Sequence, residues 1–504
     1  MGRAMNLTRA SFLRLWVTLC LLVGHSAAQE PTAPARPRNV LFLFADDLRT
    51  DAVHAFGGEH AKTPELDRLA ARGMRFRANH CMGSRHGAVC APSRAMLMTG
   101  RYLTHVPDDM GDATTFPAVF GAAGYTTFAT GKWHNGRPSF ARSFQTGHAE
   151  FFGGMADHNA VPIVDFDKGV FGKERKGEKH SSELFADAVI GFLEQHHDEA
   201  PDKPFLCYAA FTAPHDPRDA PPDYRAAALA DRPPLPPNFR PQHGWNIGKD
   251  ALLVRDEQLA AWPRDPEVIR DQLAEYYALV THLDAQIGRV LATLERLGYA
   301  KDTIVVFTAD HGLALGSHGL LGKQSLYEHS MSCPLVIAIP GGPEGDSVSL
   351  TYLLDLFPTL CGLCGLTVPA GVDGKDLAPI LRDPHAKVRD DLFTLYRDNQ
   401  RALRDGRYKL MRFTQTGKTL LFDLQSDPHE IHDLSEDPAQ RGRIAALLAR
   451  IKTWQELCGD AQPLVPDDPL PLTIDLSGHE RKPDQWQPAW IRAKYFGEHE
   501  DGKK

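Results

Sequence analysis

Three short apolar runs, far apart in the sequence, each end in polar residues, and this pattern constrains the fold more than any other feature. The runs cover residues 39–44, 205–211 and 303–308. Continuous apolar runs of this length are typical of strands buried on both faces of a parallel sheet. Ligand sites in open α/β sheets lie at the carboxyl ends of such strands. The polar residues that follow the three runs are Asp46 and Asp47, His215, and Asp310 and His311.

Helical patterns fill the intervals between the runs. Apolar residues recur every three or four positions over 273–297 and again over 183–193. Strand, helix and strand in alternation predict an α/β fold, with a large, mostly parallel sheet covered by helices on both faces. Residues 214–242 are rich in proline, so we expect neither regular helix nor central strand there, and we interpret this segment as a wall of the cleft.

The pattern changes in the last quarter of the chain. Residues 390–435 show short alternating pieces separated by Asp-Gly and Thr-Gly pairs, and a helix is expected over 439–457. These features predict a smaller C-terminal subdomain with an antiparallel sheet and a helix. The expected organisation is a leader over 1–28, a Pro-rich linker over 29–38, a large domain over 39–375, the subdomain over 376–460 and an extended tail over 461–504.

The first 28 residues resemble a secretory signal. Three arginines precede an apolar stretch over 15–23, and Ser26-Ala27-Ala28 forms a small-residue cleavage site. An uncleaved membrane anchor is the alternative, although the stretch is short for a bilayer span. We therefore expect an exported protein, periplasmic or secreted, without a stable membrane anchor. Removing the three leader arginines takes the net charge from −8 to −11, which does not favour nucleic acid as a partner.

The chain has eight cysteines, and Cys20 lies in the leader. With Cys90 set aside for the reason given below, an even number of cysteines remains, which permits disulfides without requiring them. Cys361 and Cys364 have the spacing of a redox pair, but they close an apolar segment, so packed helix cysteines are the favoured interpretation.

A dense motif surrounds Cys90. The sequence Cys90-Ala91-Pro92-Ser93-Arg94 leads through a short helix-forming segment to Thr99-Gly100-Arg101. A buried cysteine before a Pro-started helix is the simplest structural interpretation. Asp46, Asp47, Asp310 and His311 suit a hard divalent cation, since carboxylate oxygens bind Ca²⁺ or Mg²⁺. Adjacent strand residues point to opposite faces, so Asp46 and Asp47 can bind one ion only if the strand ends and turns there.

Together these motifs resemble the formylglycine-dependent sulfatases of the alkaline-phosphatase superfamily, over roughly residues 39–434. The matching elements are Ala45-Asp46-Asp47, Thr63-Pro64-Glu65-Leu66-Asp67, the Cys90 motif, Gly131-Lys132-Trp133-His134, Pro214-His215, Asp310-His311-Gly312 and Gly322-Lys323. The resemblance implies that Cys90 is converted to formylglycine by a maturation enzyme. It also implies that Asp46, Asp47, Asp310, His311 and the modified Cys90 bind one metal ion, usually Ca²⁺. Many relatives carry Asn at the position of His311, which leaves the metal less certain.

The remaining roles follow from the charge of a sulfate ester. Arg94, Lys132 and Lys323 are expected to neutralise its oxygens, and His215, alone or with Lys323, to protonate the leaving alcohol. His134 is expected to deprotonate the second hydroxyl of the hydrated aldehyde. Ordinary surface lysines and core histidines are the structural alternatives.

Three further sequence features are weaker. His318 and Arg49 are candidates for substrate binding, with a turn histidine and a helix cap as the alternatives. The basic run over 168–179 either meets a polyanion or forms a solvated hairpin.

The expected function is hydrolysis of sulfate esters, on sulfated carbohydrates. Phosphonate monoester or phosphodiester hydrolysis is the alternative within the superfamily, and a non-catalytic carbohydrate-binding protein is the alternative outside enzymes. A non-catalytic binding protein would be expected to lack one or more catalytic groups, yet every expected group is present in this sequence.

Overall fold

The computed structural model describes residues 38–476, 478–479 and 487–497. The leader and nearly all of the linker therefore lie outside the described residues. Among the described residues, no helix combines the length and the apolar character needed to cross a bilayer.

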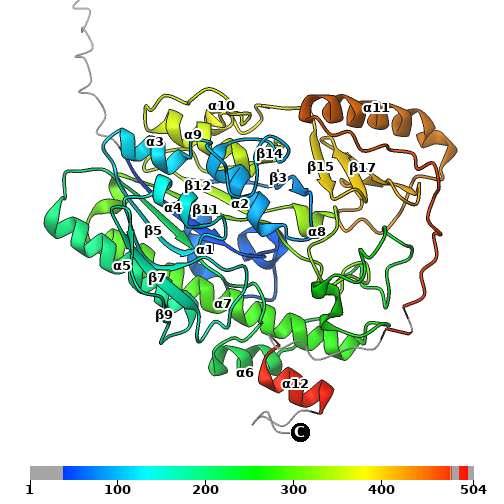
Figure 1. The fold of residues 1–504 in the computed structure, drawn as a ribbon, viewed down its shortest axis with the longest axis horizontal. Coiled ribbons are helices and arrows are strands. Elements are labelled where there is room, and N and C mark those ends of the chain that lie inside the picture. Colours follow the sequence, from blue (N-terminus) through cyan, green and yellow to red (C-terminus); the bar gives the residue numbers. More distant parts are fainter. Residues whose placement is uncertain (1–37, 477, 480–486, 498–504) are drawn as a thin grey trace, which may run out of the picture. The chain divides into compact units, whose positions relative to one another are not determined.

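A large mixed sheet is the centre of the fold (Figure 1). Its strand order is β13 (Gly345–Ser347), β2 (Met74–Phe76), β12 (Leu335–Ala338), β11 (Thr303–Ala309), β1 (Asn39–Ala45), β10 (Phe205–Ala210), β5 (Thr126–Lys132), β6 (Thr146–Phe151), β7 (Pro162–Asp167) and β8 (Val170–Phe171), with β9 (Arg175–Lys176) paired to β7. The three predicted strands are β1, β10 and β11, and β1 pairs with the other two in parallel. The prediction of a mostly parallel sheet at the centre is confirmed.

Helices bury both faces of this sheet. Val40, Phe42 and Phe44 of β1 belong to one apolar cluster, whereas Leu41 and Leu43 belong to another. The first face is covered by α2 (Cys90–Thr99), α3 (Phe116–Ala122), α4 (Arg137–Ser143), α9 (Leu356–Leu363) and α10 (Ala378–Arg382). The second face is covered by α1 (Pro64–Ala71), α5 (Ser181–Glu199) and α7 (Pro266–Arg296). Double burial explains why the strands are apolar at every position.

The smaller antiparallel sheet is also confirmed. Its order is β18 (Thr419–Asp423), β17 (Tyr408–Phe413), β16 (Gln400–Arg404), β15 (Leu392–Tyr396) and β4 (Gly83–Ser84), and α11 (Arg441–Cys458) packs on it. The short strand β4 comes from the part of the chain just before Cys90 and pairs with β15 in parallel. Two further short strands, β3 (Asn79–His80) and β14 (Thr351–Tyr352), form a separate pair, and α8 (Glu328–Met331) lies between β11 and β12 in the sequence. The domain boundary at 375/376 stays a prediction.

Two local expectations are wrong. The Pro-rich segment 214–242 contains a helix, α6 (Pro222–Ala230), because Pro222 occupies the first helical turn, where a missing N–H costs no hydrogen bond. Within the expected extended tail, residues 489–496 form α12 (Ala489–Phe496). Trp490 and Lys494 anchor α12 by donating hydrogen bonds to Glu275 and Asp271 of α7.

Candidate active site

Four parallel strands deliver the candidate residues to one edge of the sheet. Phe44 of β1 is in register with Ala210 of β10, and Ala210 is in register with Gly131 of β5. On the other side, Ala45 is in register with Ala309 of β11. The residues that follow or end these strands therefore emerge side by side. They are Asp46 and Asp47, the loop to His215, Lys132, and Asp310 and His311.

The strand carrying the two adjacent acids ends and turns as the sequence argument requires. β1 ends at Ala45, and Asp47 has a φ of 63°, in the left-handed region. The Asp310 carboxylate links the two strand ends, because its Oδ1 accepts hydrogen bonds from the backbone N–H of Asp47 and of His311, both at 3.0 Å. The turn allows Asp46 and Asp47 to face the same space.

Helix α2 brings Cys90 to these strand ends. All ten residues of the helix are buried, and Cys90 is its first residue. The Ser93 hydroxyl donates to the Asp310 carbonyl at 2.7 Å. Arg94 donates to Asp310 Oδ2 at 3.1 Å and to the Lys132 carbonyl at 2.6 Å. Two side chains of the Cys90 motif thus fix the start of α2 against the end of β11 and against β5.

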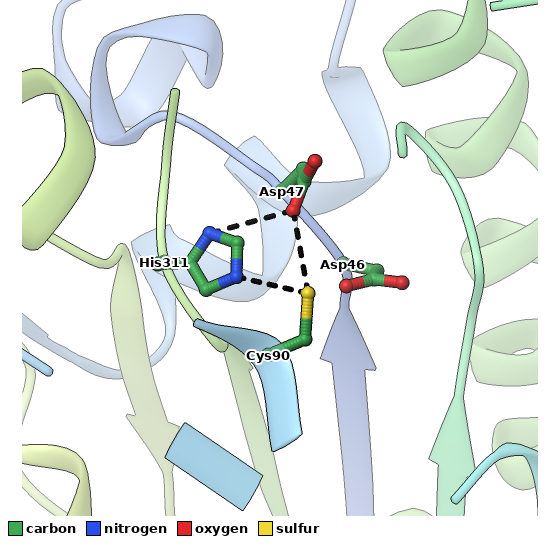
Figure 2. A group of neighbouring side chains, drawn as sticks. All are labelled: Asp46, Asp47, Cys90 and His311. Carbon is green, nitrogen blue, oxygen red and sulfur yellow. Dashed lines mark hydrogen bonds and ion pairs between the residues drawn. The ribbon is translucent and has the colours of Figure 1, made fainter. Parts of the chain in front are cut away.

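Four of the five predicted metal ligands converge. Ligand atoms of Asp46, Asp47, Cys90 and His311 all lie within 4.8 Å of one another (Figure 2). His311 Nε2 is 3.1 Å from Cys90 Sγ, and its Nδ1 is 3.4 Å from Asp47 Oδ1. Asp46 Oδ1 is buried and has no hydrogen-bond partner among the described residues. Two carboxylates, one of which has a buried oxygen without a hydrogen-bond partner, and an imidazole fit a divalent cation.

The fifth predicted ligand, Asp310, is not part of this four-residue group. Its carboxylate accepts the two backbone hydrogen bonds described above and faces Arg94. Although burial opposes ionisation, His311 and Arg94 hold the pKa of Asp310 well below its ordinary value. Asp310 is therefore an ionised group at the site whose ligand role stays a prediction.

Lysines compensate the buried carboxylates. Lys132 forms an ion pair with Asp46, and Lys323 Nζ donates to both oxygens of Asp47 at 2.9 and 3.0 Å. Burial raises the pKa of Asp47 to about 6, although Lys323 opposes the shift. Burial also raises the pKa of the Cys90 thiol. Lys323 Nζ lies 3.4 Å from Cys90 Sγ, so this lysine contacts both a candidate ligand and the candidate nucleophile.

His215 forms a hydrogen-bonded pair with Lys323. Its Nδ1 lies 2.6 Å from the Asp216 carbonyl, which accepts only, so Nδ1 carries the proton in this arrangement. Nε2 then accepts from Lys323 Nζ at 2.9 Å. Burial, followed by the charges of Lys323 and Lys132, lowers the pKa of His215 well below its ordinary value. The geometry makes Lys323 the proton donor of the pair.

His134 follows β5 by two residues and lies at the same edge. Its φ is 72°, and its Nδ1 is buried without a hydrogen-bond partner among the described residues. Burial, with the nearby charges of Lys132 and Arg94, lowers the pKa of His134 to about 2. His134 is therefore neutral at physiological pH, as a proton acceptor must be.

The two weaker candidates, His318 and Arg49, have other partners. The His318 ring stacks on Tyr327 at 3.9 Å between centroids. The Arg49 guanidinium pairs with Asp51 and donates to the carbonyls of Leu313 and Ala314. Neither side chain forms a hydrogen bond or ion pair with Asp46, Asp47, Cys90 or His311, and their role in substrate binding stays a prediction.

Sequence reasoning did not single out Asp216. Together with Asp47 and His215 it forms a second group of ligand atoms within 4.8 Å of one another. Burial opposes ionisation, but Arg255 and Arg218 hold the pKa of Asp216 below its ordinary value. Its position directly after His215 was the only available signal, because its ion-pair partner, Arg255, comes from a segment distant in the sequence.

Comparison with known proteins identifies the family to which the chain belongs. The sulfatase family model matches residues 38–366. The chain belongs to the sulfatase family. A second model, described as N-sulphoglucosamine sulphohydrolase, C-terminal, matches residues 316–456 of the sulfatase. The protein is a sulfuric ester hydrolase, and its family implies a formylglycine and a metal-dependent mechanism in general.

Individual relatives cover most of this sulfatase. An N-acetylglucosamine-6-O-sulfatase of Bacteroides thetaiotaomicron is 26% identical over 88% of the chain and 89% of its own length. An N-acetylgalactosamine-6-sulfatase of Mus musculus is 30% identical, over 78% of the chain and 75% of its own length.

Solved structures share the fold of this sulfatase. One was determined in complex with its substrate D-glucosamine-2-N,6-O-disulfate. It has a TM-score of 0.73 at 23% identity and covers 85% of the chain and 99% of its own. A phosphonate monoester hydrolase from Silicibacter pomeroyi has a TM-score of 0.63 at 23% identity, covering 84% and 96%.

Proposed function

We propose that this sulfatase hydrolyses sulfate esters of carbohydrates, with formylglycine at position 90 as the nucleophile and Ca²⁺ as the bound cation. The convergence of Cys90 with Asp46, Asp47 and His311 carries the proposal. The carbohydrate is supported by the names of relatives, which act on sulfated sugars. Hard oxygen ligands favour Ca²⁺ or Mg²⁺ over softer metals.

The chemistry needs a nucleophile that a thiol does not provide. In the structure the Cys90 sulfur stands where the oxygens of a hydrated formylglycine would lie. The hydrate would supply two geminal hydroxyls, one to attack sulfur and one to release sulfate afterwards, and a bound cation would supply positive charge to neutralise the oxyanion. Asp46, Asp47, His311 and, by family resemblance, Asp310 would hold that cation.

The chain's own side chains perform the remaining tasks. Lys132 and Arg94 place positive charge beside the carboxylates and the nucleophile, which stabilises developing charge on the sulfate oxygens. Lys323 donates a proton towards the leaving oxygen, and His215 orients it through the Nζ to Nε2 hydrogen bond. Neutral His134 accepts the proton of the second hydroxyl.

We also propose that the protein is exported, on the basis of the signal-like segment 1–28, and that a formylglycine-generating enzyme matures it. A peptide containing Cys90, from a host with that enzyme, should show CH₂SH replaced by CHO in mass spectrometry. The Cys90→Ala variant should lose at least about 10³-fold in turnover, because the nucleophile is gone. An active preparation whose Cys90 is wholly unmodified contradicts the mechanism.

Substrate preference separates the two superfamily activities. The matured protein should turn over 4-nitrophenyl sulfate and sulfated saccharides faster than a matched phosphonate monoester or phosphodiester. The phosphonate monoester hydrolase among the structural neighbours shares the fold at 23% identity, so fold alone does not decide between them. A clear preference for the phosphorus substrate would replace this proposal with the alternative.

A further inference from the structure

One buried arginine beside the active site has no ion-pair partner among the residues that the structure describes. Arg218 lies three residues after His215 and is only 3% exposed. Its single hydrogen bond to a described residue runs from Nη1 to Gln272 Oε1, at 2.5 Å. Its Nε is buried without a partner, and no described carboxylate lies within 4.0 Å of its nitrogens. The Nε and Nη2 edge of the guanidinium is therefore unused.

Other buried arginines of the protein are paired. Arg94 contacts Asp310, Arg264 contacts Glu257, and Arg389 contacts both oxygens of Asp355. A buried charge is costly unless a counter-charge and hydrogen bonds compensate it. Burial lowers the pKa of Arg218 even though Asp216 and Asp47 act in the opposite direction. The described carboxylates therefore offset only part of the cost of burying Arg218.

The surroundings show why Asp216 does not satisfy Arg218. The Asp216 carboxylate forms its ion pair with Arg255, which also contacts Asp256. Asp256 in turn accepts a hydrogen bond from Gln324 at 2.8 Å. Both acids near His215, Asp216 and Asp256, thus have other partners, and one edge of the Arg218 guanidinium has none among the described residues.

This edge lies close in the chain to the proposed chemistry. The loop after β10 carries both His215 and Arg218, and His215 is linked through Lys323 Nζ to Cys90 Sγ by contacts of 2.9 and 3.4 Å. Asp47 contributes to the electrostatic potential at Arg218. For Arg218 to bind it, a saccharide whose sulfate ester sits at Cys90 would present a neighbouring substituent to this loop.

We infer that Arg218 is a specificity-determining residue that binds a second anionic group of the substrate, a carboxylate or a second sulfate. The inference rests on the proposed function and narrows it to saccharides with at least two negative charges. The planar guanidinium fork matches either anion in a bidentate arrangement, and a ligand anion would supply the missing counter-charge.

Binding to a chain that cannot turn over tests the inference directly. In the Cys90→Ala background, calorimetric titration compares sulfated disaccharides that carry one anionic group with those that carry two. One arm adds a second sulfate and the other adds a uronic carboxylate. We expect the doubly charged ligands to bind more tightly, and Arg218→Gln to weaken them by about 10- to 100-fold while changing the singly charged ones less than about threefold. The ligand series whose binding Arg218→Gln weakens shows whether the second anionic group is a sulfate or a carboxylate.

Three results overturn the inference: no preference for doubly charged ligands in the Arg218 protein, equal weakening of both ligand classes, or the same loss in the control Arg270→Gln, whose side chain is half-buried on α7. The proposed function is assayed separately, with Cys90 intact and 4-nitrophenyl sulfate as substrate. Arg218→Gln should keep that activity within about threefold. Failure of the matured wild-type protein to hydrolyse any sulfate ester contradicts the proposed function instead.

Stability distinguishes a binding role from a structural one. Because Arg218 is unpaired, Arg218→Met should leave the thermal midpoint unchanged or raise it when no ligand is present. The matched control Arg389→Met removes a paired buried arginine and should lower the midpoint. A decrease for Arg218→Met as large as that of the control assigns Arg218 to the fold and overturns the inference.

Discussion

At the scale of single residues, the site concentrates buried charges that compensate one another, and Glu150 of β6 is an exception elsewhere in the sheet. Glu150 is 2% exposed, and its Oε1 has no hydrogen-bond partner among the described residues. Burial, with a smaller contribution from Asp165, raises its pKa well above the ordinary value. The folded protein therefore holds a proton on Glu150 that the unfolded chain has already released.

The sign of the pH effect follows from this difference. A carboxyl with a raised pKa in the folded state contributes stability below its unfolded pKa and loses it as the pH rises through the folded pKa. We expect Glu150→Gln to increase the free energy of unfolding more at pH 8 than at pH 5, by on the order of 1–3 kcal/mol. Urea unfolding at both pH values measures it.

The exposed Glu174→Gln serves as a control for Glu150→Gln and should show no such difference between the two pH values. If Glu150→Gln lowers the free energy of unfolding equally at pH 5 and pH 8, Glu150 is ionised and has a partner in the folded protein. That result contradicts a protonated Glu150.

At the scale of elements, the edge of the sheet depends on close packing between β5 and β10. A Cβ on Gly131 would lie 2.0 Å from the Ala210 carbonyl oxygen, and Gly131 has a φ of +92°. Gly131→Ala should therefore cost more than about 3 kcal/mol or prevent folding, because a backbone atom of β10 must move. Because Gly131 directly precedes Lys132, any Gly131→Ala protein that still folds should also have a reduced turnover rate.

Gly124 provides a matched control for Gly131. It has the same φ of +92°, but a Cβ there meets nothing within 4 Å. Gly124→Ala should cost only the backbone strain, about 1–2 kcal/mol. Chemical denaturation of the two variants separates strain from collision, and equal losses would show that the close approach is relieved elsewhere.

The elements also show how far sequence reasoning reaches. β1, β10 and β11 were predictable because each is a local apolar run, and the convergence of Asp46, Asp47 and His311 followed from where such runs end. Cys90 lies on a helix, and only the family resemblance placed it in this group. α6 was missed because a proline count does not reveal which proline starts a helix. The partners of Arg49, His318 and Arg218 depend on loops distant in sequence, which no local pattern reveals.

At the scale of the whole molecule, a bound cation should stabilise the protein. Removing a ligand that binds only the folded state lowers stability by about 3–4 kcal/mol if it had been present at 100 to 1,000 times its Kd. For a chain of this size that corresponds to roughly 3–4 °C in the thermal midpoint. Calorimetry after treatment with a chelator, then with added Ca²⁺, measures the loss and its recovery.

The control for the metal experiment is Asp47→Asn together with Asp310→Asn, which should no longer respond to Ca²⁺. An unaltered midpoint in the wild-type protein after complete metal removal, checked by elemental analysis, contradicts the proposed site.

The pairing of β4 with β15 has a consequence for the order of events during synthesis. β4 immediately precedes the segment with Cys90, and its partner residues, Leu395 and Tyr396, are translated much later. Once folded, Cys90 is only 2% exposed inside a wholly buried helix. The proposed maturation enzyme would therefore act on the nascent chain, before β4 pairs with β15 and the helix is buried, and a chain that folded first would keep its unmodified cysteine out of reach.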